Sequence, residues 1–323
     1  MTFSCRSIVR PFIVSLTLVL AVTLIGVAQS SFKIDTETVR NSIVFLHYVD
    51  DRGVATESGT GFLLGIPDKT DSRKGWIVLV TARHIVDPKW AGCAAPTGEL
   101  KAVFNKKDYD PSRDATGVVE ASLGNWIYPD DQSVDIAFQL LDALALSKMA
   151  VENEAVILSE LPSVDEVRRI GTGSQVISAG LLLGASGTKR NFPVFKFGYV
   201  STIPSEKIAV SCCPQCEAKP YTEWLIAASL VPGNSGSPIV YVPPGAPGIG
   251  LVGERAFLLG VQSISFIGSD VAGMAPIQVL LDTMRSKLDL KNADFSVGSP
   301  IKAPQQPTSV SAPAKPESTQ LPK

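Results

Sequence analysis

The sequence lacks most features that indicate a nucleic-acid, nucleotide or metal function. Its 323 residues include only two histidines, the formal net charge is −2, and no run of Lys or Arg occurs inside the body of the chain. This balance gives no electrostatic footprint for nucleic acid or anionic lipid. No Walker loop, dinucleotide fingerprint or His-Glu-x-x-His motif is present, so no cofactor and no metal are predicted. The expected partners are peptides or proteins, and the oligomeric state stays open.

Residues 1–30 have the layout of a secretory signal peptide. Two arginines flank a short polar start, an uncharged run covers Pro11 to Val27, and small residues follow. We expect cleavage after Ala28 or Ser30. The alternative is an uncleaved signal anchor, because the apolar run is near the short end of the roughly 17 to 25 residues that span a bilayer. Either way we expect a secreted or periplasmic chain, bound to a membrane only if the segment is retained.

Four cysteines remain after this segment, an even number in a compartment where disulfide bonds persist. They are Cys93, Cys212, Cys213 and Cys216. One or two disulfide bridges are expected, with the pairing left open. Cys213 and Cys216 form a Cys-x-x-Cys pair, but no histidine or second pair completes a zinc site. We interpret their loop, residues 205–221, as a disulfide-stapled surface loop, with gating of a cleft as the alternative.

The chain from about residue 36 to 272 has the rhythm of an all-β protein. Apolar residues make up 45% of the sequence, enough for a sizeable core. Short β-rich runs alternate with Gly, Asp and Pro in two series, about 36–145 and 165–272. Residues 276–289 show helical spacing, with Pro early and basic residues late, and predict a helix. Residues 294–323 are rich in Pro, Ser, Gln and Lys and are predicted to be a disordered tail.

The sharpest local motif is Pro-Gly-Asn-Ser-Gly-Ser-Pro at residues 232–238. Glycines on both sides of Ser235 let the backbone turn tightly and bring successive amides toward one point. A nucleophilic serine needs such a turn, because the oxyanion of a tetrahedral intermediate must meet N–H donors, here those of Gly233 and Ser235. The same residue types are also common in ordinary β-turns, so the motif does not decide by itself.

A serine nucleophile usually requires a histidine base, and only His47 and His84 are available. His84 follows the apolar run Trp76 to Ala82, at the point where a buried strand breaks into a loop or helical turn. A side chain there can face a cleft from a rigid support. His47 lies inside an apolar strand, and we interpret it as a strand residue with a satisfied hydrogen bond.

The third member should be a carboxylate that fixes the tautomer of the histidine and stabilises its imidazolium form. Asp135 stands immediately before an apolar strand, where a charge is costly unless it is paired. Asp87, Asp130 and Asp131 are competitors, but each lies in a polar loop where solvation explains it. The sequence therefore predicts Asp135 as the partner of His84.

These segments, in this order, resemble the trypsin-like serine peptidases, and more closely the bacterial HtrA/Deg branch. The resemblance covers about residues 43–288. Further motifs that carry it are Gly59-Thr60-Gly61-Phe62, Gly198-Tyr199-Val200-Ser201 and Gly273 to Ile277. The spacing adds to it, with 51 residues from His84 to Asp135 and 100 from there to Ser235.

The resemblance implies one peptidase domain over residues 31–293, built as two six-stranded antiparallel β-barrels of the chymotrypsin type with a C-terminal helix. The first barrel would supply the base and the acid, the second the nucleophile and the oxyanion amides. An extended substrate would add as a strand to the segment from Ser263 to Ser265. Ser229, six residues before the nucleophile, would form the floor of the primary pocket. Because it is not an acid, we expect an uncharged, small to medium apolar residue before the scissile bond.

Two departures from these families limit what carries over. Digestive trypsins have an aspartate immediately before the nucleophile, which pairs with a new N-terminus after cleavage, whereas this chain has Asn234. Activation by that ion pair is therefore not expected. The PDZ domain that usually follows in the HtrA/Deg branch is not expected here either.

Two other functions compete with the peptidase. One is a catalytically silent peptide- or cell-wall-binding protein on the same scaffold. The other, an esterase of the α/β-hydrolase kind, needs a Gly-x-Ser-x-Gly elbow and the order Ser, acid, His, neither of which the chain has.

Overall fold

The structure is a computed structural model, and it describes most of the chain after the N-terminal segment. The described residues are 36–71, 74–92, 96–157, 161–187, 189–211, 217–244, 256–266 and 268–295. The predictions for the signal segment, for the four cysteines and for the chain beyond residue 295 concern residues outside these ranges.

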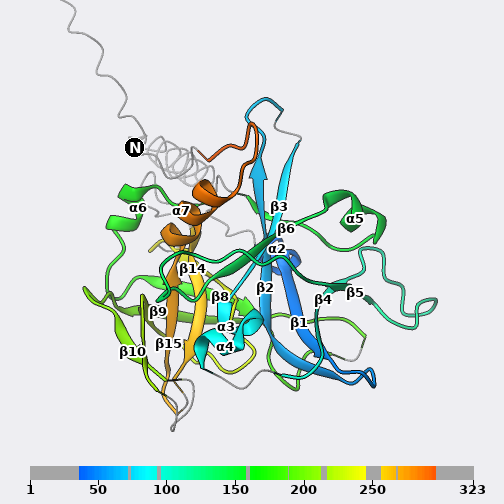
Figure 1. Cartoon of the computed structure of the whole chain (residues 1–323), viewed down its shortest axis with the longest axis horizontal. Coiled ribbons are helices and arrows are strands. Elements are labelled where there is room, and N and C mark those ends of the chain that lie inside the picture. Colours follow the sequence, from blue (N-terminus) through cyan, green and yellow to red (C-terminus); the bar gives the residue numbers. More distant parts are fainter. Residues whose placement is uncertain are drawn as a thin grey trace, which may run out of the picture.

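The first half of the molecule is an antiparallel sheet with strand order β5-β4-β1-β2-β3-β6 (Figure 1). Helix α2 (Thr36–Ser42) leads into β1 (Ile43–Val49), β2 (Ala55–Pro67), β3 (Gly75–Thr81), β4 (Glu99–Asn105), β5 (Val118–Ser122) and β6 (Ala137–Leu141). A seventh strand, β7 (Val156–Ile157), pairs in parallel with β2. This half therefore has one strand more than the six expected, because part of the stretch between the two series joins the sheet.

Both faces of the first sheet carry buried residues at its centre, where successive side chains of a strand point to opposite faces. On β2, Leu63 packs into a cluster with Leu46 and Leu79. Its neighbours Phe62 and Leu64 point the other way, into a cluster that also contains residues of the second half and of the C-terminal helix. The second face of the sheet is thus the surface on which the two halves meet.

The second half is a closed barrel with strand order β12-β15-β14-β13-β8-β9. Its strands are β8 (Gln175–Gly180), β9 (Val194–Thr202), β12 (Trp224–Ala227), β13 (Pro238–Val242), β14 (Phe257–Ser265) and β15 (Val271–Pro276). The interior is filled by an apolar cluster that includes Val200, Ile226, Leu259 and Met274. A separate antiparallel pair, β10 (Ile208–Val210) and β11 (Lys219–Tyr221), stands beside it.

Helix α7 (Ile277–Lys287) ends the described chain apart from a short extension, and it packs on β14 and β15. It begins directly after Pro276, whose fixed φ suits a helix start, and carries Arg285 and Lys287 in its last turn, as the helix dipole favours. The other helices are short: α3 (Arg83–Val86), α4 (Pro88–Ala91), α5 (Ala143–Lys148) and α6 (Val164–Arg168). Within the described ranges, none of the helices has the length and apolarity needed to cross a membrane.

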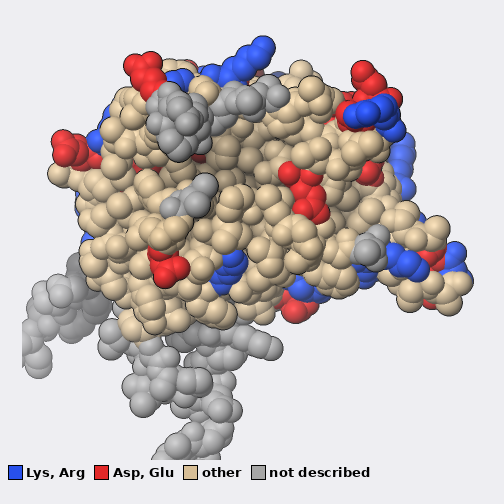
Figure 2. All heavy atoms as spheres, turned by 90° about the horizontal axis from the view of Figure 1, so that it is seen from below, with Lys and Arg blue, Asp and Glu red and all other residues tan. Residues whose placement is uncertain are grey.

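The predicted fold class, an all-β protein of two antiparallel barrel-like units with a C-terminal helix, is confirmed. Figure 2 shows one face of this molecule, on which acidic and basic side chains are scattered among residues that carry neither charge.

Candidate active site

The structure brings His84 and Asp135 together at the end of β3. His84 is the second residue of α3, which follows the strand after a single residue. Its Nδ1 lies 2.6 Å from Oδ2 of Asp135, and its backbone N–H donates to Oδ1 at 2.9 Å. Asp135 is only 1% exposed, so its carboxyl oxygens are satisfied by these two groups of His84 and not by bulk water.

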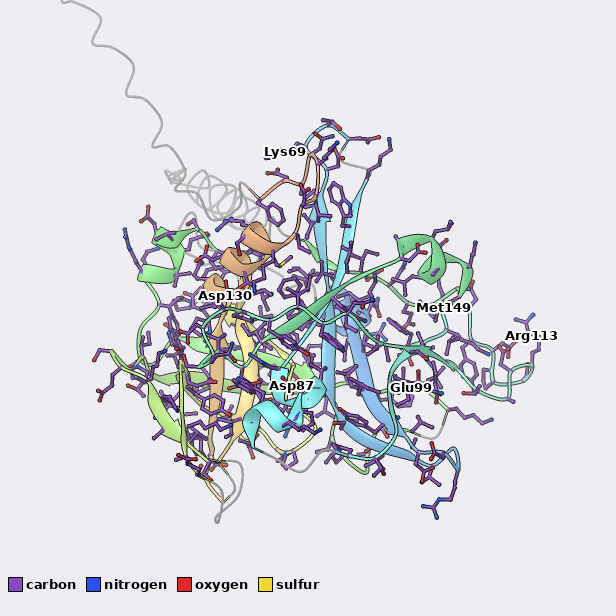
Figure 3. The ribbon with its side chains drawn as sticks, in the orientation of Figure 1. Lys69, Asp87, Glu99, Arg113, Asp130 and Met149 are labelled. Carbon is purple, nitrogen blue, oxygen red and sulfur yellow. The ribbon has the colours of Figure 1, made fainter. Side chains whose placement is uncertain are left out.

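The competing acids have other partners. Asp87 caps α4 by accepting from the Trp90 N–H at 3.3 Å and forms an ion pair with Arg83. Asp130 pairs with Lys287 at 2.6 Å. Asp131 accepts from Ser133 and pairs with Lys207. Figure 3 shows Asp87 beside the short α3 and α4 helices and Asp130 on a separate stretch of chain.

The contact with Asp135 sets the proton positions on His84. A carboxylate can only accept, so Nδ1 carries the proton and Nε2 is left with a free lone pair, the form that a general base requires. Burial opposes a positive charge on the ring, but the charge of Asp135 and its hydrogen bond outweigh this effect and raise the pKa of His84 above its usual value. The side chain keeps 24% of its surface exposed, so a reacting group can reach it.

The serine turn, residues 232–238, is held in shape by Asn234. This residue is buried immediately before the candidate nucleophile Ser235. Its Oδ1 accepts from the Val231 N–H at 3.0 Å, and its Nδ2 donates to the Leu181 carbonyl at 2.8 Å. An aspartate could not make the second bond, because a carboxylate does not donate. Asn234 thus ties the turn to the end of β8 through a neutral side chain.

Glycine is required on both sides of Asn234 and Ser235. Gly233 and Gly236 have φ angles of 95° and 88°, in the region that side-chain-bearing residues rarely adopt. A Cβ on Gly236 would lie 1.9 Å from the Thr60 carbonyl oxygen, and one on Gly233 would lie 2.9 Å from the Leu183 side chain. The turn therefore fits against its neighbours only with these two residues.

Thr60, in the Gly-Thr-Gly-Phe motif of β2, connects the serine turn to the first half of the molecule. Its N–H donates to the Ser235 carbonyl at 2.8 Å, and its Oγ1 donates to the Gly233 carbonyl at 2.7 Å. The same Oγ1 accepts from the Leu181 N–H at 2.8 Å. The position before it must be glycine, because a Cβ on Gly59 would meet both the Ile85 side chain and the Ser235 carbonyl. This junction places the helix of the histidine against the turn of the serine.

The Ser235 hydroxyl donates to the carbonyl of Ser263, at the end of β14, with Oγ and O 3.0 Å apart. Among the hydrogen bonds of the described residues, none joins Ser235 to His84. Proton transfer to the histidine would therefore begin with a rotation of the Ser235 side chain. Contacts of this kind often tighten only when a substrate is present.

Two backbone donors of the turn are unused. The N–H groups of Gly233 and Ser235 donate to no acceptor among the described residues, although both residues are buried. Buried backbone donors are almost always paired, so two unpaired donors two positions apart indicate a place for an acceptor from outside the protein.

Glu223 belongs to this site but is not among the residues that the sequence analysis predicted. It lies just before β12, is 3% exposed, and accepts from the Ser263 Oγ at 2.6 Å through Oε2, while Oε1 has no partner within the part of the chain that is described. Burial, opposed by the Ser263 hydrogen bond and reinforced by the charge of Asp135, raises the pKa of Glu223 well above its usual value. The signal that could have found it is the one that marked Asp135, a charge immediately before an apolar strand.

Of the predicted substrate-contacting residues, Ser263 lies against the serine turn, where its carbonyl accepts from the Ser235 hydroxyl. Ser263 and the residue after it leave the strand ladder, because the register of β14 against β15 shifts between Gln262 and Ser265. Ser265 accepts from Gln262 Nε2 at 3.3 Å. Ser229 is exposed, and its carbonyl accepts from Lys196 Nζ at 2.6 Å.

His47 differs from its prediction. It lies on β1 as expected, but its Nε2 is buried with no hydrogen-bond partner in the described part of the chain. Burial outweighs the nearby Glu57 and Glu120 and lowers the pKa of His47, so the ring stays neutral. The expected hydrogen bond is therefore not found for this ring nitrogen. In the same described ranges, no group of three or more His, Cys, Asp or Glu side chains could hold a metal ion.

The fold and the site together define an all-β protein of two barrel-like halves with a histidine–carboxylate pair and a serine turn at their junction. Comparison with solved structures finds GrC, 14% identical over 77% of this chain and 94% of that chain, with a TM-score of 0.42. It also finds the murine norovirus NS6 protease, 13% identical over 68% and 88% of the two chains, with a TM-score of 0.32, and a chimeric form of that protease, 14% identical over 68% and 87%, with the same score. No family model and no curated protein matches the chain. At these identities and TM-scores the likeness gives no information about the function of this chain.

Proposed function

We propose that this protein is a serine endopeptidase that hydrolyses peptide bonds through an acyl-enzyme on Ser235. The observation that carries the proposal is the junction described above, at which a histidine held by a buried carboxylate and a serine turn with two unused N–H donors meet around Thr60. The motif likeness to the HtrA/Deg branch of the trypsin-like peptidases supports the same assignment.

Each group has a defined step in this mechanism. Ser235 Oγ attacks the carbonyl carbon of the scissile bond while Nε2 of His84 takes its proton, and Asp135 stabilises the resulting imidazolium. The oxyanion accepts from the N–H groups of Gly233 and Ser235. When the C–N bond breaks, His84 returns the proton to the leaving amine, and a water molecule activated by His84 then hydrolyses the ester. A general base contributes typically about 10²–10⁴-fold to the rate, and one oxyanion donor about 10²–10³-fold.

A peptide chain is the substrate that this geometry suits best. Ser263 and Ile264 leave the ladder at a register shift next to the nucleophile, and an extended peptide would pair with this stretch of β14 once the Ser235 hydroxyl turns away from the Ser263 carbonyl. The signal-like layout of residues 1–30 supports action outside the cytoplasm, in the periplasm or the medium.

One observation favours a second function, a catalytically silent protein that binds peptides on the same scaffold. The Ser235 hydroxyl donates to the Ser263 carbonyl and not to His84. If the side chain kept this orientation when a peptide binds, the nucleophile would not be activated.

Active-site labelling separates the two functions. The chain from Ser31 onward and its Ser235→Ala variant would be treated with a fluorophosphonate and assayed for casein hydrolysis. Labelling and hydrolysis that disappear in the variant establish the peptidase. If neither chain is labelled, even after limited proteolysis or addition of peptides, the binding function replaces it.

A further inference from the structure

The inner face of the second barrel carries polar side chains near the serine turn. Ser178 on β8 faces Lys196 on β9, and its other cross-strand partner is Ile239, a residue of the barrel core. Gln262 on β14 faces Met274, which is also in that core. Directly opposed residues of antiparallel strands project from the same face of the sheet. Ser178, Lys196 and Gln262 therefore all project from the inner face of the barrel.

Two of these side chains have buried polar atoms that no group in the described part of the chain satisfies. Ser178 Oγ and Gln262 Oε1 have no hydrogen-bond partner among the residues that the structure describes. Buried polar atoms without partners are few in native proteins, and each calls for an explanation. These two atoms make part of the inner face of the barrel polar beside an otherwise apolar core.

Lys196 adds a positive charge at the same end of the barrel. Its ammonium donates to the carbonyl of Ser229 at 2.6 Å, and no carboxylate of the described chain lies within ion-pair distance of it. Partial burial lowers the pKa of Lys196, as expected for a cation that has lost water without gaining a counter-ion. The residues on either side of Ser229 are buried in the barrel, whereas Ser229 itself is exposed, so the bonded ammonium lies where the barrel opens to solvent.

Ser229 links this cation to the candidate active site. It stands six residues before Ser235 in the chain, at the position where the resemblance places the floor of the primary pocket. The identity of Ser229 alone suggests an uncharged pocket. The structure adds a lysine from a different strand, 33 residues earlier in the sequence, whose charge lies against that floor.

We propose that Lys196 is a specificity-determining residue and that the pocket beside Ser235 takes an acidic side chain, so that the protein cleaves after Glu or Asp. The proposal rests on the peptidase function and refines its substrate class. The Lys196 ammonium donates one of its three N–H groups to the Ser229 carbonyl, which leaves two donors. A substrate carboxylate would accept from them and would supply the counter-ion that the described part of the chain does not provide. This replaces the apolar preference expected from the sequence.

The test compares matched peptides that differ only in the residue before the scissile bond, with Glu, Asp, Gln, Leu or Lys at that position. For the chain from Ser31 onward we expect kcat/KM for Glu to exceed that for its neutral isostere Gln at least about 10-fold. Lys196→Met should bring the Glu-to-Gln ratio close to 1, because the charge pairing is lost; the ratio is the readout, since the same change also removes the hydrogen bond to the Ser229 carbonyl and can alter the rate on every peptide. Lys196→Arg should retain a preference for acids, and Lys196→Glu should shift it toward the Lys peptide.

Lys148→Met is the matched control, since this lysine is exposed on α5 in the other half of the molecule and should leave every ratio unchanged. If the wild-type chain cleaves the Leu or Gln peptide as well as the Glu peptide and still depends on Ser235, the acidic preference is wrong and the peptidase function stands. If no peptide is cleaved and no fluorophosphonate label is taken up, the peptidase function and the inference fall together.

Discussion

Ser263 and Glu223 form a buried pair in which the hydroxyl of the serine donates to the carboxyl oxygen of the glutamate at 2.6 Å. The carbonyl of the same Ser263 accepts the hydroxyl of Ser235. The nucleophile candidate is therefore connected to a buried acid through a single residue of β14. The pair also has little room to move, because a Cβ on Gly273 would lie within 3 Å of both side chains.

Replacing Glu223 should separate the roles of its shape and its charge. Because burial raises its pKa and so favours the neutral form, Glu223→Gln should preserve kcat within about 3-fold. Glu223→Ala should lower kcat about 10-fold or more, since it leaves a cavity and an unpaired hydroxyl beside Ser235. Steady-state kinetics of both variants check this. A Gln variant as inactive as the Ala variant would show that the negative charge is needed.

The same raised pKa predicts how stability depends on pH. Between the usual carboxyl value and the folded value, the unfolded chain has released the Glu223 proton and the folded chain has not, so stability falls as pH rises through this window. Glu223→Gln removes this loss. Thermal unfolding should show that the stability of the variant, relative to the wild type, increases as the pH rises from about 4. Equal stability differences at pH 4 and pH 8 would contradict the assignment.

The pH profile of hydrolysis should report the His84–Asp135 pair. The pKa of His84 is raised, so the acid limb of kcat/KM should lie above the usual histidine value of about 6.5, with activity rising as the imidazolium loses its proton. Asp135→Asn removes the charge that raises this pKa. We expect the acid limb of the profile to move to lower pH and kcat to fall roughly 10³–10⁴-fold. Asp130→Asn, which breaks an exposed ion pair with Lys287, is the control and should change neither quantity.

The hydroxyl of Thr60 should be needed for the shape of the serine turn. Thr60→Val leaves the Gly233 carbonyl and the Leu181 N–H without their buried partner, which costs about 1–3 kcal/mol for each unsatisfied group. Thr60→Ser keeps the hydroxyl and should retain most of the stability and the fluorophosphonate labelling. Denaturant unfolding together with the labelling rate tests this pair, and a Val variant labelled as fast as the wild type would count against the role.

Gly236 should tolerate no side chain. Gly236→Ala forces a φ of 88° on an alanine and brings its Cβ to 1.9 Å from the Thr60 carbonyl oxygen, so we expect a loss of at least about 1–3 kcal/mol and of labelling. Gly171 is the control, because its φ is not positive and an added Cβ would meet nothing within 4 Å. Gly171→Ala should unfold at nearly the wild-type denaturant concentration.

The residues of the proposed triad could be found from the sequence because each has a local signature. Asp135 is a lone charge before a buried strand, His84 follows the end of another buried strand, and Ser235 lies between two glycines. These features depend on neighbours within a few positions, where alternation and turn chemistry act. The two series of strands and the last helix were predictable for the same reason.

The contacts between distant parts of the chain were decided only by the tertiary structure. Thr60 and the Gly233 carbonyl are 173 positions apart, and Ser263 and Glu223 are 40 apart. No local pattern marks such pairs, because they arise when the barrel closes and the two halves pack on each other. The pairing of β7 with β2 and the orientation of the Ser235 hydroxyl follow in the same way.

Lys196 shows the difference most clearly. In the sequence it is one lysine in a strand of alternating aromatic residues, and nothing nearby indicates a partner. Closure of the barrel carries its ammonium to the carbonyl of Ser229. The sequence by itself determined which residues could perform the chemistry, because that depends on residue type and local backbone. The tertiary structure decided which charges surround them, because burial and distance exist only once the chain has folded.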